Sequence, residues 1–247
     1  MNVKIAAILG LTVLLSGVPT WASLDTVTLS SAGYGATGTA KIYGGGHDGV
    51  TTTAGLLKYE VTASSGAGDD LFDVGSTIGV FCMDLGQYAS SYKTYDITDP
   101  ADGPVPDTYL GSGMGVEKAA LLSELWGRYY DSSWLTGSTY TEAQKNAAEA
   151  FQICIWEIIY EDYGNAVDIT SDGTSGELGF KAKYVESSLA NSWLTSLDGT
   201  GPTADLVSLS NCYSQDFLTA VNVEVPEPAT VALLGFGMMI VTRATRK

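Results

Sequence analysis

β-branched and aromatic residues gather in short runs through the first half of the chain. Glycine-rich segments such as Gly44-Gly45-Gly46 and Gly66-Ala67-Gly68-Asp69 separate these runs. Because Val, Ile, Thr and Tyr favour extended backbone and glycine favours turns, the pattern predicts a succession of strands. The predicted strands are Leu24–Leu29, Thr37–Tyr43, Val50–Thr62, Ile78–Leu85 and Tyr88–Ile97.

The second half begins with helical spacing. Apolar residues recur every three or four positions in Val116–Trp126, which predicts a helix with one apolar face. Thr141 and Gln144 have the spacing of a capping box, so a second helix is expected to begin there. The remaining predicted elements are a helix over Phe180–Leu197 and strands over Leu206–Leu209 and Phe217–Val225.

This order of elements predicts the fold class. Strands, then helices, then strands indicate an α+β fold, in which a strand-rich, sandwich- or barrel-like module receives an inserted helical segment before its last strands. About 200 residues between the two chain ends are enough for one domain with its own core.

The N-terminus has the composition of a secretory signal peptide. Lys4 precedes an apolar run, Ile5–Val18, and Ala22 ends a plausible cleavage site. We therefore expect residues 1–22 to be removed on export. An uncleaved anchor is less favoured because the apolar run is short and ends at Pro19.

The C-terminus has three parts in a fixed order: a spacer, an apolar run and a basic end. They are Pro226, Glu227 and Pro228, then Ala229–Val241, then Arg243, Arg246 and Lys247. This arrangement resembles the PEP-CTERM sorting signal of Gram-negative bacteria. The resemblance implies a sorting helix over residues 226–247 that enters the membrane transiently, and an exosortase that removes it. A plain membrane anchor is the alternative, although the apolar run is short for a span of about 20 residues.

The exported part, residues 23–225, is strongly acidic. It holds eight Lys or Arg against 27 Asp or Glu, a formal net charge of −19. A surface of that sign repels phosphate backbones, so nucleic acid is not expected as a partner. The expected location is the cell envelope, the cell surface or the extracellular space.

Three cysteines in an exported chain leave at least one thiol unpaired within the chain. Cys82 lies in a predicted strand, Cys154 in a predicted helix and Cys212 in a polar turn. The simplest interpretation pairs two of them as a disulfide and leaves the third buried or free.

Two short motifs suggest a more specific chemistry. Phe81-Cys82-x-Asp84 and Gln152-x-x-Ile155-Trp156 resemble the aromatic-Cys and Gln-x-x-x-Trp elements of the thioester domains of bacterial surface adhesins. The resemblance covers about Ile78–Tyr163. It implies an internal thioester between Cys82 and Gln152, with Phe81, Asp84, Ile155 and Trp156 around it.

Two positions depart from the family's pattern. Phe151 stands where the family usually has Thr, and Cys154 where it has Ala. Neither position supplies a bond-forming atom, although Phe151 alters the packing around Gln152 and Cys154 is a competing thiol nearby. If the thioester forms, the leftover cysteines are Cys154 and Cys212, and a disulfide between them is the dependent expectation.

The resemblance implies a function in adhesion. A thioester held in the fold acylates an amine or hydroxyl of a surface polymer or protein once and does not turn over, so the chain is not expected to be an enzyme. The alternative is a non-covalent structural protein of an exopolysaccharide-associated extracellular matrix, with the same fold and no thioester. A cysteine hydrolase would need Cys82, His47 and Asp48 to meet in space.

No cofactor is expected, and a metal site has weak support. With one histidine and separated cysteines, zinc-ligand spacing is absent. Structural calcium is conceivable at two clusters of aspartates, which by default form turns. The clusters are Asp96, Asp99, Asp102 and Asp107, and Asp168 and Asp172 beside Gly173.

Tyrosine and tryptophan are abundant in the helical half. They would suit a carbohydrate-stacking surface, but helical spacing makes most of them core residues. The residues concerned are Trp126, Tyr129, Tyr130, Trp134, Tyr160, Tyr163 and Trp193.

Overall fold

The computed structural model describes residues 25–105, 110–161, 167–171, 173, 179–183 and 185–221. Within these residues, seven strands form one antiparallel sheet. They are β1 (Thr26–Gly44), β2 (His47–Ser65), β3 (Thr77–Cys82), β4 (Tyr92–Thr98), β5 (Phe180–Lys183), β6 (Leu206–Ser210) and β7 (Phe217–Ala220).

Six of these strands form a closed barrel. The strand order is β2-β3-β7-β6-β4-β1-β5, and β1 also pairs with β2. The pairing can therefore be followed from β1 through β2, β3, β7, β6 and β4 back to β1. A sheet closed in this way has no free edge within the circuit. The predicted strand-rich, barrel-like module is therefore present, with β5 added outside the closed circuit.

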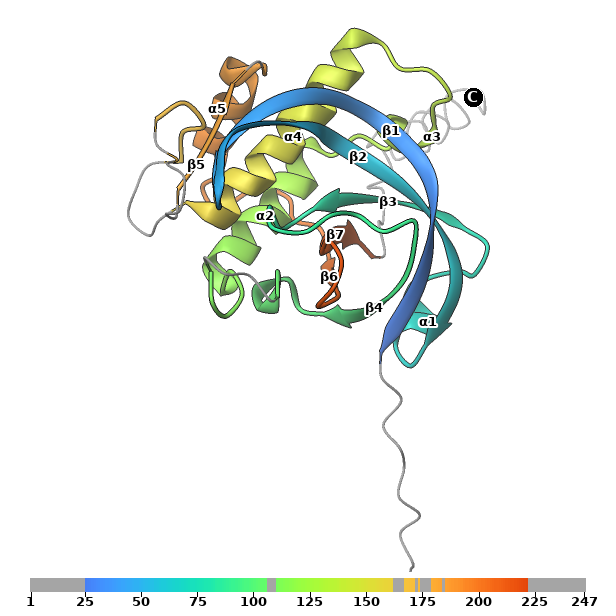
Figure 1. Ribbon diagram of the computed structural model, residues 1–247. Helices are drawn as coiled ribbons and strands as arrows, with labels where there is room; N and C mark the ends of the chain where they lie inside the picture. The colour runs from blue at the N-terminus through green and yellow to red at the C-terminus, as the bar shows by residue number, and fades with distance from the viewer. Residues whose placement is uncertain are drawn as a thin grey trace, which may run out of the picture.

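The long β1–β2 hairpin extends beyond the barrel and arches over the helices (Figure 1). Its register shifts at four places, among them Ser31/Gly33 and Tyr34/Thr37, and such bulges bend a strand pair. Gly33 and Gly55, both with positive φ, lie in the bent part. The expectation of two separate strands, Leu24–Leu29 and Thr37–Tyr43, is wrong because pairing with β2 continues through the polar stretch between them.

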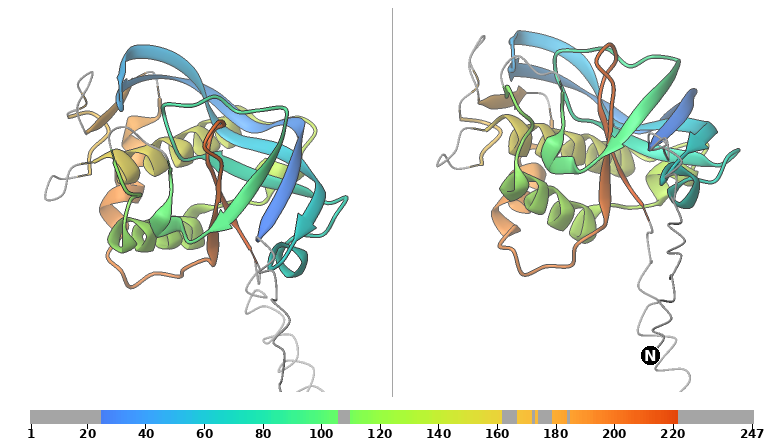
Figure 2. Two further views of the ribbon diagram at one scale, coloured as in Figure 1. Left: turned by 60° about the horizontal axis from the view of Figure 1, so that its bottom comes forward. Right: turned by 90° about the horizontal axis from the view of Figure 1, so that it is seen from below.

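The helices lie between β4 and β6 in the chain, as expected for an inserted segment, and Figure 2 shows them grouped on one side of the barrel strands. The helices of this segment are α2 (Val116–Tyr129), α3 (Ser133–Thr136), α4 (Glu142–Tyr160) and α5 (Ser187–Ser196). Two short helical turns precede them, α1 (Gly68–Leu71) and η1 (Pro100–Asp102).

The predicted helix over Phe180–Leu197 is only half right. Its first residues form β5, which pairs with the end of β1 from Gly44 to Lys41, and only the later part forms α5. Residues 180–183 form a strand because the free edge of β1 is available for pairing. The pattern of side chains along the chain does not reveal such an edge.

Strand β3 separates two apolar cores. Phe81 faces the helices and belongs to the larger core, which contains Leu122, Trp126, Trp134 and Phe151. Val80 faces the barrel interior with Tyr59, Tyr95 and Phe217. Cys82, at the end of β3, is packed against both cores.

Helix α4 begins at the predicted capping box. The Thr141 hydroxyl accepts from the Gln144 backbone N–H at 3.2 Å, and the Thr141 N–H donates to the Gln144 side chain at 3.0 Å. We expect Thr141→Ala to lower the free energy of unfolding by about 1 kcal/mol, measured by urea denaturation. The exposed Thr195→Ala change in α5 is the control; an equal loss there would contradict a specific capping effect.

Candidate functional site

The structure brings Cys82 and Gln152 together. The Cys82 backbone N–H donates to Gln152 Oε1 at 2.9 Å, and Gln152 Nε2 donates to the Cys82 carbonyl at 2.8 Å. The amide oxygen and the amide nitrogen are thus both hydrogen-bonded to the backbone of the residue that carries the candidate thiol. The amide carbon between them is held beside the backbone of Cys82, although 70 residues separate the two along the chain.

The local sheet geometry explains this pairing. Strand β2 pairs with β3 only as far as Val80, opposite Leu57. Beyond that point, β3 remains paired with β7, where Cys82 lies opposite Phe217. The backbone groups of Cys82 on the β2 side therefore have no strand partner, and the Gln152 amide takes the place of the missing strand.

Gln152 itself is held by the helix. It lies in the middle of α4, is 1% exposed, and its neighbours Phe151 and Ile153 are fully buried. A buried amide without partners would be costly, so its two hydrogen bonds fix the side chain in one orientation.

The thiol of Cys82 lies on the barrel side of β3. Side chains alternate along a strand, so Cys82 shares a face with Val80 and not with Phe81. Burial, and to a smaller extent the nearby Asp84 carboxylate, raises the pKa of the Cys82 thiol far above its usual range. The thiol is therefore protonated at neutral pH, unlike the thiolate of a cysteine hydrolase.

Aromatic rings cover the helix side of the pair. The Phe81 and Phe151 ring centroids are 4.8 Å apart. Trp126 and Trp134 each contact Phe151, at 5.5 and 5.4 Å. We call these four rings the aromatic cluster. It excludes water from the helix side of the Gln152 amide.

The other residues of the second motif lie farther along α4. Ile155 is fully buried, and Trp156 packs against Phe180 with ring centroids 6.0 Å apart. Trp156 has no ring contact with Phe81 or Phe151 among the described residues. Trp156 lies four residues after Gln152 in α4, on the same side of the helix, so its expected place around the pair stays a prediction.

Asp84 organises the chain directly after Cys82. Its carboxylate accepts from the Gln87 N–H at 2.8 Å and from the Asp216 N–H at 2.7 Å. Asp216 is also buried, and its carboxylate accepts from Val105 and Asn211. Burial raises the pKa of Asp216 to about 7. Sequence patterns do not reveal Asp216, since it lies in a loop 132 residues after its partner.

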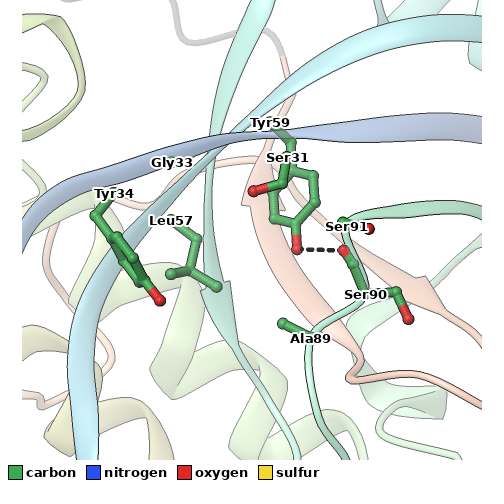
Figure 3. Close-up of a pocket in the computed structure, with 8 residues that line it drawn as sticks. All are labelled: Ser31, Gly33, Tyr34, Leu57, Tyr59, Ala89, Ser90 and Ser91. Atoms are coloured by element: carbon green, nitrogen blue, oxygen red, sulfur yellow. Dashed lines mark hydrogen bonds between the residues drawn. The ribbon is translucent and has the colours of Figure 1, made fainter.

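A small hollow lies on the same sheet face as the thiol. Its volume is about 190 Å³, and Figure 3 shows residues of β1 and β2 on one side and of the loop before β4 on the other. Tyr59 donates from its hydroxyl to the Ser90 carbonyl at 2.9 Å. Residues that line the hollow include Ser31, Tyr34, Leu57, Tyr59, Ser90 and Ser91.

The register connects this hollow with Cys82. Leu57 lies opposite both Tyr34 on β1 and Val80 on β3, and Val80 shares its face with Cys82. Burial raises the pKa of the Tyr59 phenol above its usual range, with smaller contributions from Tyr95 and Cys82. Leu57 therefore links the hollow, which it lines, to the face of β3 that carries Val80 and Cys82.

The expected disulfide between Cys154 and Cys212 is not present. All three cysteines are free. Cys154 is buried against α5, where its Sγ donates to the Ala190 carbonyl at 3.5 Å, whereas Cys212 is exposed in the turn before β7. Burial raises the pKa of Cys154 well above its usual range, so it is an unreactive core thiol.

The hydrolase arrangement does not form. His47 Nε2 lies 2.6 Å from the Leu85 carbonyl, so that ring nitrogen contacts the backbone and no carboxylate. Asp48 is exposed in the hairpin. Together with the protonated thiol, this leaves Cys82 without an imidazole base.

The aspartate clusters make turns where the structure describes them. Asp99 accepts from the Ala101 N–H at 2.8 Å, and Asp168 accepts from Thr170 and Asn191. No group of three or more potential metal ligands occurs within the described residues. Asp107 and Asp172 lie outside them.

Aromatic residues of the helical half pack inside the molecule. Trp126 stacks on Tyr130 at 4.8 Å, and Tyr129 stacks on Trp193 at 4.7 Å. Trp126 and Trp134 are nearly completely buried. The carbohydrate-stacking surface considered for these residues is replaced by ordinary core packing, and Tyr163 lies outside the described residues.

One family model matches the chain. Residues 224–247 match the PEP-CTERM protein-sorting motif, which confirms the predicted sorting signal. The motif implies export to the cell envelope or surface and processing by an exosortase. No curated protein and no solved structure matches the chain.

The predicted signal peptide, residues 1–22, and the sorting segment, residues 226–247, lie outside the described residues. In the part of the chain that is described, no helix is both long and apolar enough to cross a membrane.

Proposed function

We propose that this exported protein attaches covalently to a partner on another surface through an internal thioester between Cys82 and Gln152. The observation that carries the proposal is the pair of hydrogen bonds between the Gln152 amide and the Cys82 backbone, at 2.9 and 2.8 Å. They hold the amide beside the backbone of the residue that carries the nucleophile, which supports a high effective concentration for the reaction.

The reaction balances without a cofactor. The Cys82 sulfur attacks the Gln152 amide carbon, the carbon–nitrogen bond breaks, and the thiol proton leaves with the nitrogen as ammonia. The Cys82 N–H, already bonded to Oε1, stabilises the negative charge that develops on this oxygen. The bond from Nε2 to the Cys82 carbonyl is lost together with ammonia.

Burial suits the thioester itself. It is uncharged and has no proton to donate, so it needs no acceptor in an apolar surrounding. The aromatic cluster keeps water from one side of the bond. Hydrolysis is thereby slowed until an acceptor arrives from the other side.

We propose the hollow beside Tyr59 as the entry for that acceptor. Serine and tyrosine hydroxyls line it, and none of its lining residues is charged. An acceptor hydroxyl or uncharged amine attacks the thioester carbon, its proton passes to the departing sulfur, and Cys82 returns to a thiol. Each molecule reacts once, so the protein is a single-use acylating agent and not an enzyme.

The mass of the exported protein tests the proposal. We expect it to be lighter than its sequence predicts by one ammonia, and methylamine should add its own mass to the lighter form and expose one thiol to alkylation. Cys82→Ser and Gln152→Ala should have the full mass, while Cys154→Ala should keep the deficit. Full mass for the unaltered protein, with Cys82 open to alkylation before any treatment, would overturn the thioester.

A second function is favoured by the same hydrogen bonds in their unreacted state. The oxygen and the nitrogen of the Gln152 amide each have a partner as they stand and join α4 to β3, which is what a purely structural residue does. In that case the protein is a non-covalent component of an extracellular matrix. Gln152→Ala would then lower the stability of a protein whose mass had never shown a deficit.

A further inference from the structure

Three lysines surround one tyrosine at the outer end of the β1–β2 hairpin. The Nζ atoms of Lys41, Lys181 and Lys183 lie 5.8, 5.3 and 5.1 Å from the centre of the Tyr43 ring. Figure 1 shows β5, which carries Lys181 and Lys183, beside this end of the hairpin. We call these four residues the lysine patch.

The strand register forces the charges together. Lys41 lies directly opposite Lys183, and Tyr43 directly opposite Lys181. Residues at alternate positions share a face, so all four side chains are on the outer face, while Ile42 is buried on the inner one. Like charges directly opposite one another destabilise a strand pair, so this arrangement opposes folding.

The other cations of the exported chain are engaged within the protein. Lys118 donates to two backbone carbonyls, Lys58 to a third, and Arg128 and Lys145 form ion pairs with carboxylates. Lys93 lies over the ring of Tyr213. The remaining three cations differ in that they share one ring, that of Tyr43, and they form the lysine patch.

No carboxylate of the described residues neutralises this patch by an ion pair. Asp48 lies opposite Tyr43 across the hairpin, but its carboxylate is not within ion-pair distance of a lysine. The exported part holds 27 acidic residues, yet none of those that the structure describes forms an ion pair with these three ammonium groups. The Tyr43 ring reduces their repulsion and leaves their outward donors free for a ligand.

We propose that the lysine patch binds a carboxylated polysaccharide outside the cell. The sorting motif implies export, so the ligand is an extracellular one. A slender chain with carboxylates at regular intervals can follow two strands and reach all three lysines. Lysines two positions apart on one strand are about 7 Å apart, and opposite lysines about 5 Å.

The overall charge argues against broader anionic partners. An anionic membrane or a DNA duplex presents many charges to the whole protein, whose exported part has a net charge of −19. Repulsion acts over a Debye length of about 8–10 Å, so a wide anionic surface experiences the acidic residues as well as the patch. A single polysaccharide chain contacts the patch alone.

Binding of the exported protein to polygalacturonate tests the proposal, by calorimetry at several salt concentrations. We expect saturable binding that weakens with salt, and no binding to neutral dextran. Lys181→Gln/Lys183→Gln should weaken it about tenfold, because two charge-assisted hydrogen bonds are lost. The charge-matched control Lys93→Gln/Lys145→Gln should bind within about twofold of the unaltered protein.

Three outcomes would overturn the proposal: no binding to polygalacturonate, equal weakening in both double variants, or tighter binding to phosphatidylglycerol vesicles or duplex DNA than to the polysaccharide. Circular dichroism checks that the variants fold, and the single Lys183→Gln change at an exposed position provides a second test. Cys82→Ser should bind as well as the unaltered protein, since the patch does not depend on the thioester.

Discussion

Phe151→Ala is expected to lower the free energy of unfolding by about 3–5 kcal/mol, the usual cost of removing a fully buried phenylalanine. The Phe151 ring contacts Phe81, Trp126 and Trp134 and has no exposed surface. Its removal leaves a cavity in the aromatic cluster, which backbone shifts of α4 and β3 fill only in part. Urea denaturation followed by tryptophan fluorescence measures the effect.

Two further variants separate packing from the mere loss of an aromatic residue. Phe151→Leu retains most of the volume and should cost less than half as much as Phe151→Ala. Tyr213→Ala removes a ring that is 85% exposed and should change stability by less than about 0.5 kcal/mol. If Phe151→Ala were no more damaging than Tyr213→Ala, the aromatic cluster would not be the centre of the larger core.

The same residue explains a departure from the thioester-domain pattern. A threonine at position 151 would place a hydroxyl among the rings of Phe81, Trp126 and Trp134, which suit an apolar group better than a polar one. The phenylalanine ring instead packs against Phe81, the residue before Cys82. In this chain, apolar packing orients the part of α4 that presents Gln152.

Sequence patterns predicted the parts of the fold that depend on neighbouring residues. The capping box at Thr141, the turn at Gly45 and the apolar face of α2 are all local features, and all three are present. Closure of the barrel depends on pairings such as Asp96 with Ser210, whose partners are far apart in the chain. Such pairings leave no periodic signal in a single sequence.

The candidate site likewise has residues that short motifs reveal and residues that only the folded chain brings together. Cys82 and Gln152 were found because two short motifs mark them, and the structure places them in contact. Asp216 and the lysine patch were missed, since each depends on strands or loops that meet only in the folded chain. The ring of Trp156 packs against Phe180, and its expected part in covering the pair stays a prediction.

Stability is expected to increase as the pH falls from about 8 to about 5. Burial raises the pKa of Glu149 to about 7, because its carboxyl group lies against Gly38 of β1 and receives only limited compensation from the Thr39 N–H. The folded state therefore holds this proton more tightly than the unfolded chain does. The contribution is fully present below the unfolded pKa of about 4.5 and is lost as the pH rises through 7.

Asp216 acts in the same direction, since burial raises its pKa to about 7 as well. Each group contributes on the order of 3 kcal/mol across this range. Carboxylates with lowered pKa values, such as Asp168 and Asp198, act in the opposite direction, and their stabilisation is lost only at lower pH. The stability maximum should thus fall near pH 5, below the neutral range.

Glu149→Gln isolates one of the two contributions. Glutamine mimics the protonated carboxyl group, so the variant should be more stable than the unaltered protein at pH 8 and about equal to it at pH 5. Urea denaturation at both pH values measures the difference, and Glu142→Gln, at an exposed position of the same helix, should leave the pH dependence unchanged. An identical pH dependence in the Glu149→Gln and unaltered proteins would show that Glu149 ionises as freely in the folded state as in the unfolded one, and the decline in stability above pH 5 would then rest on Asp216 alone.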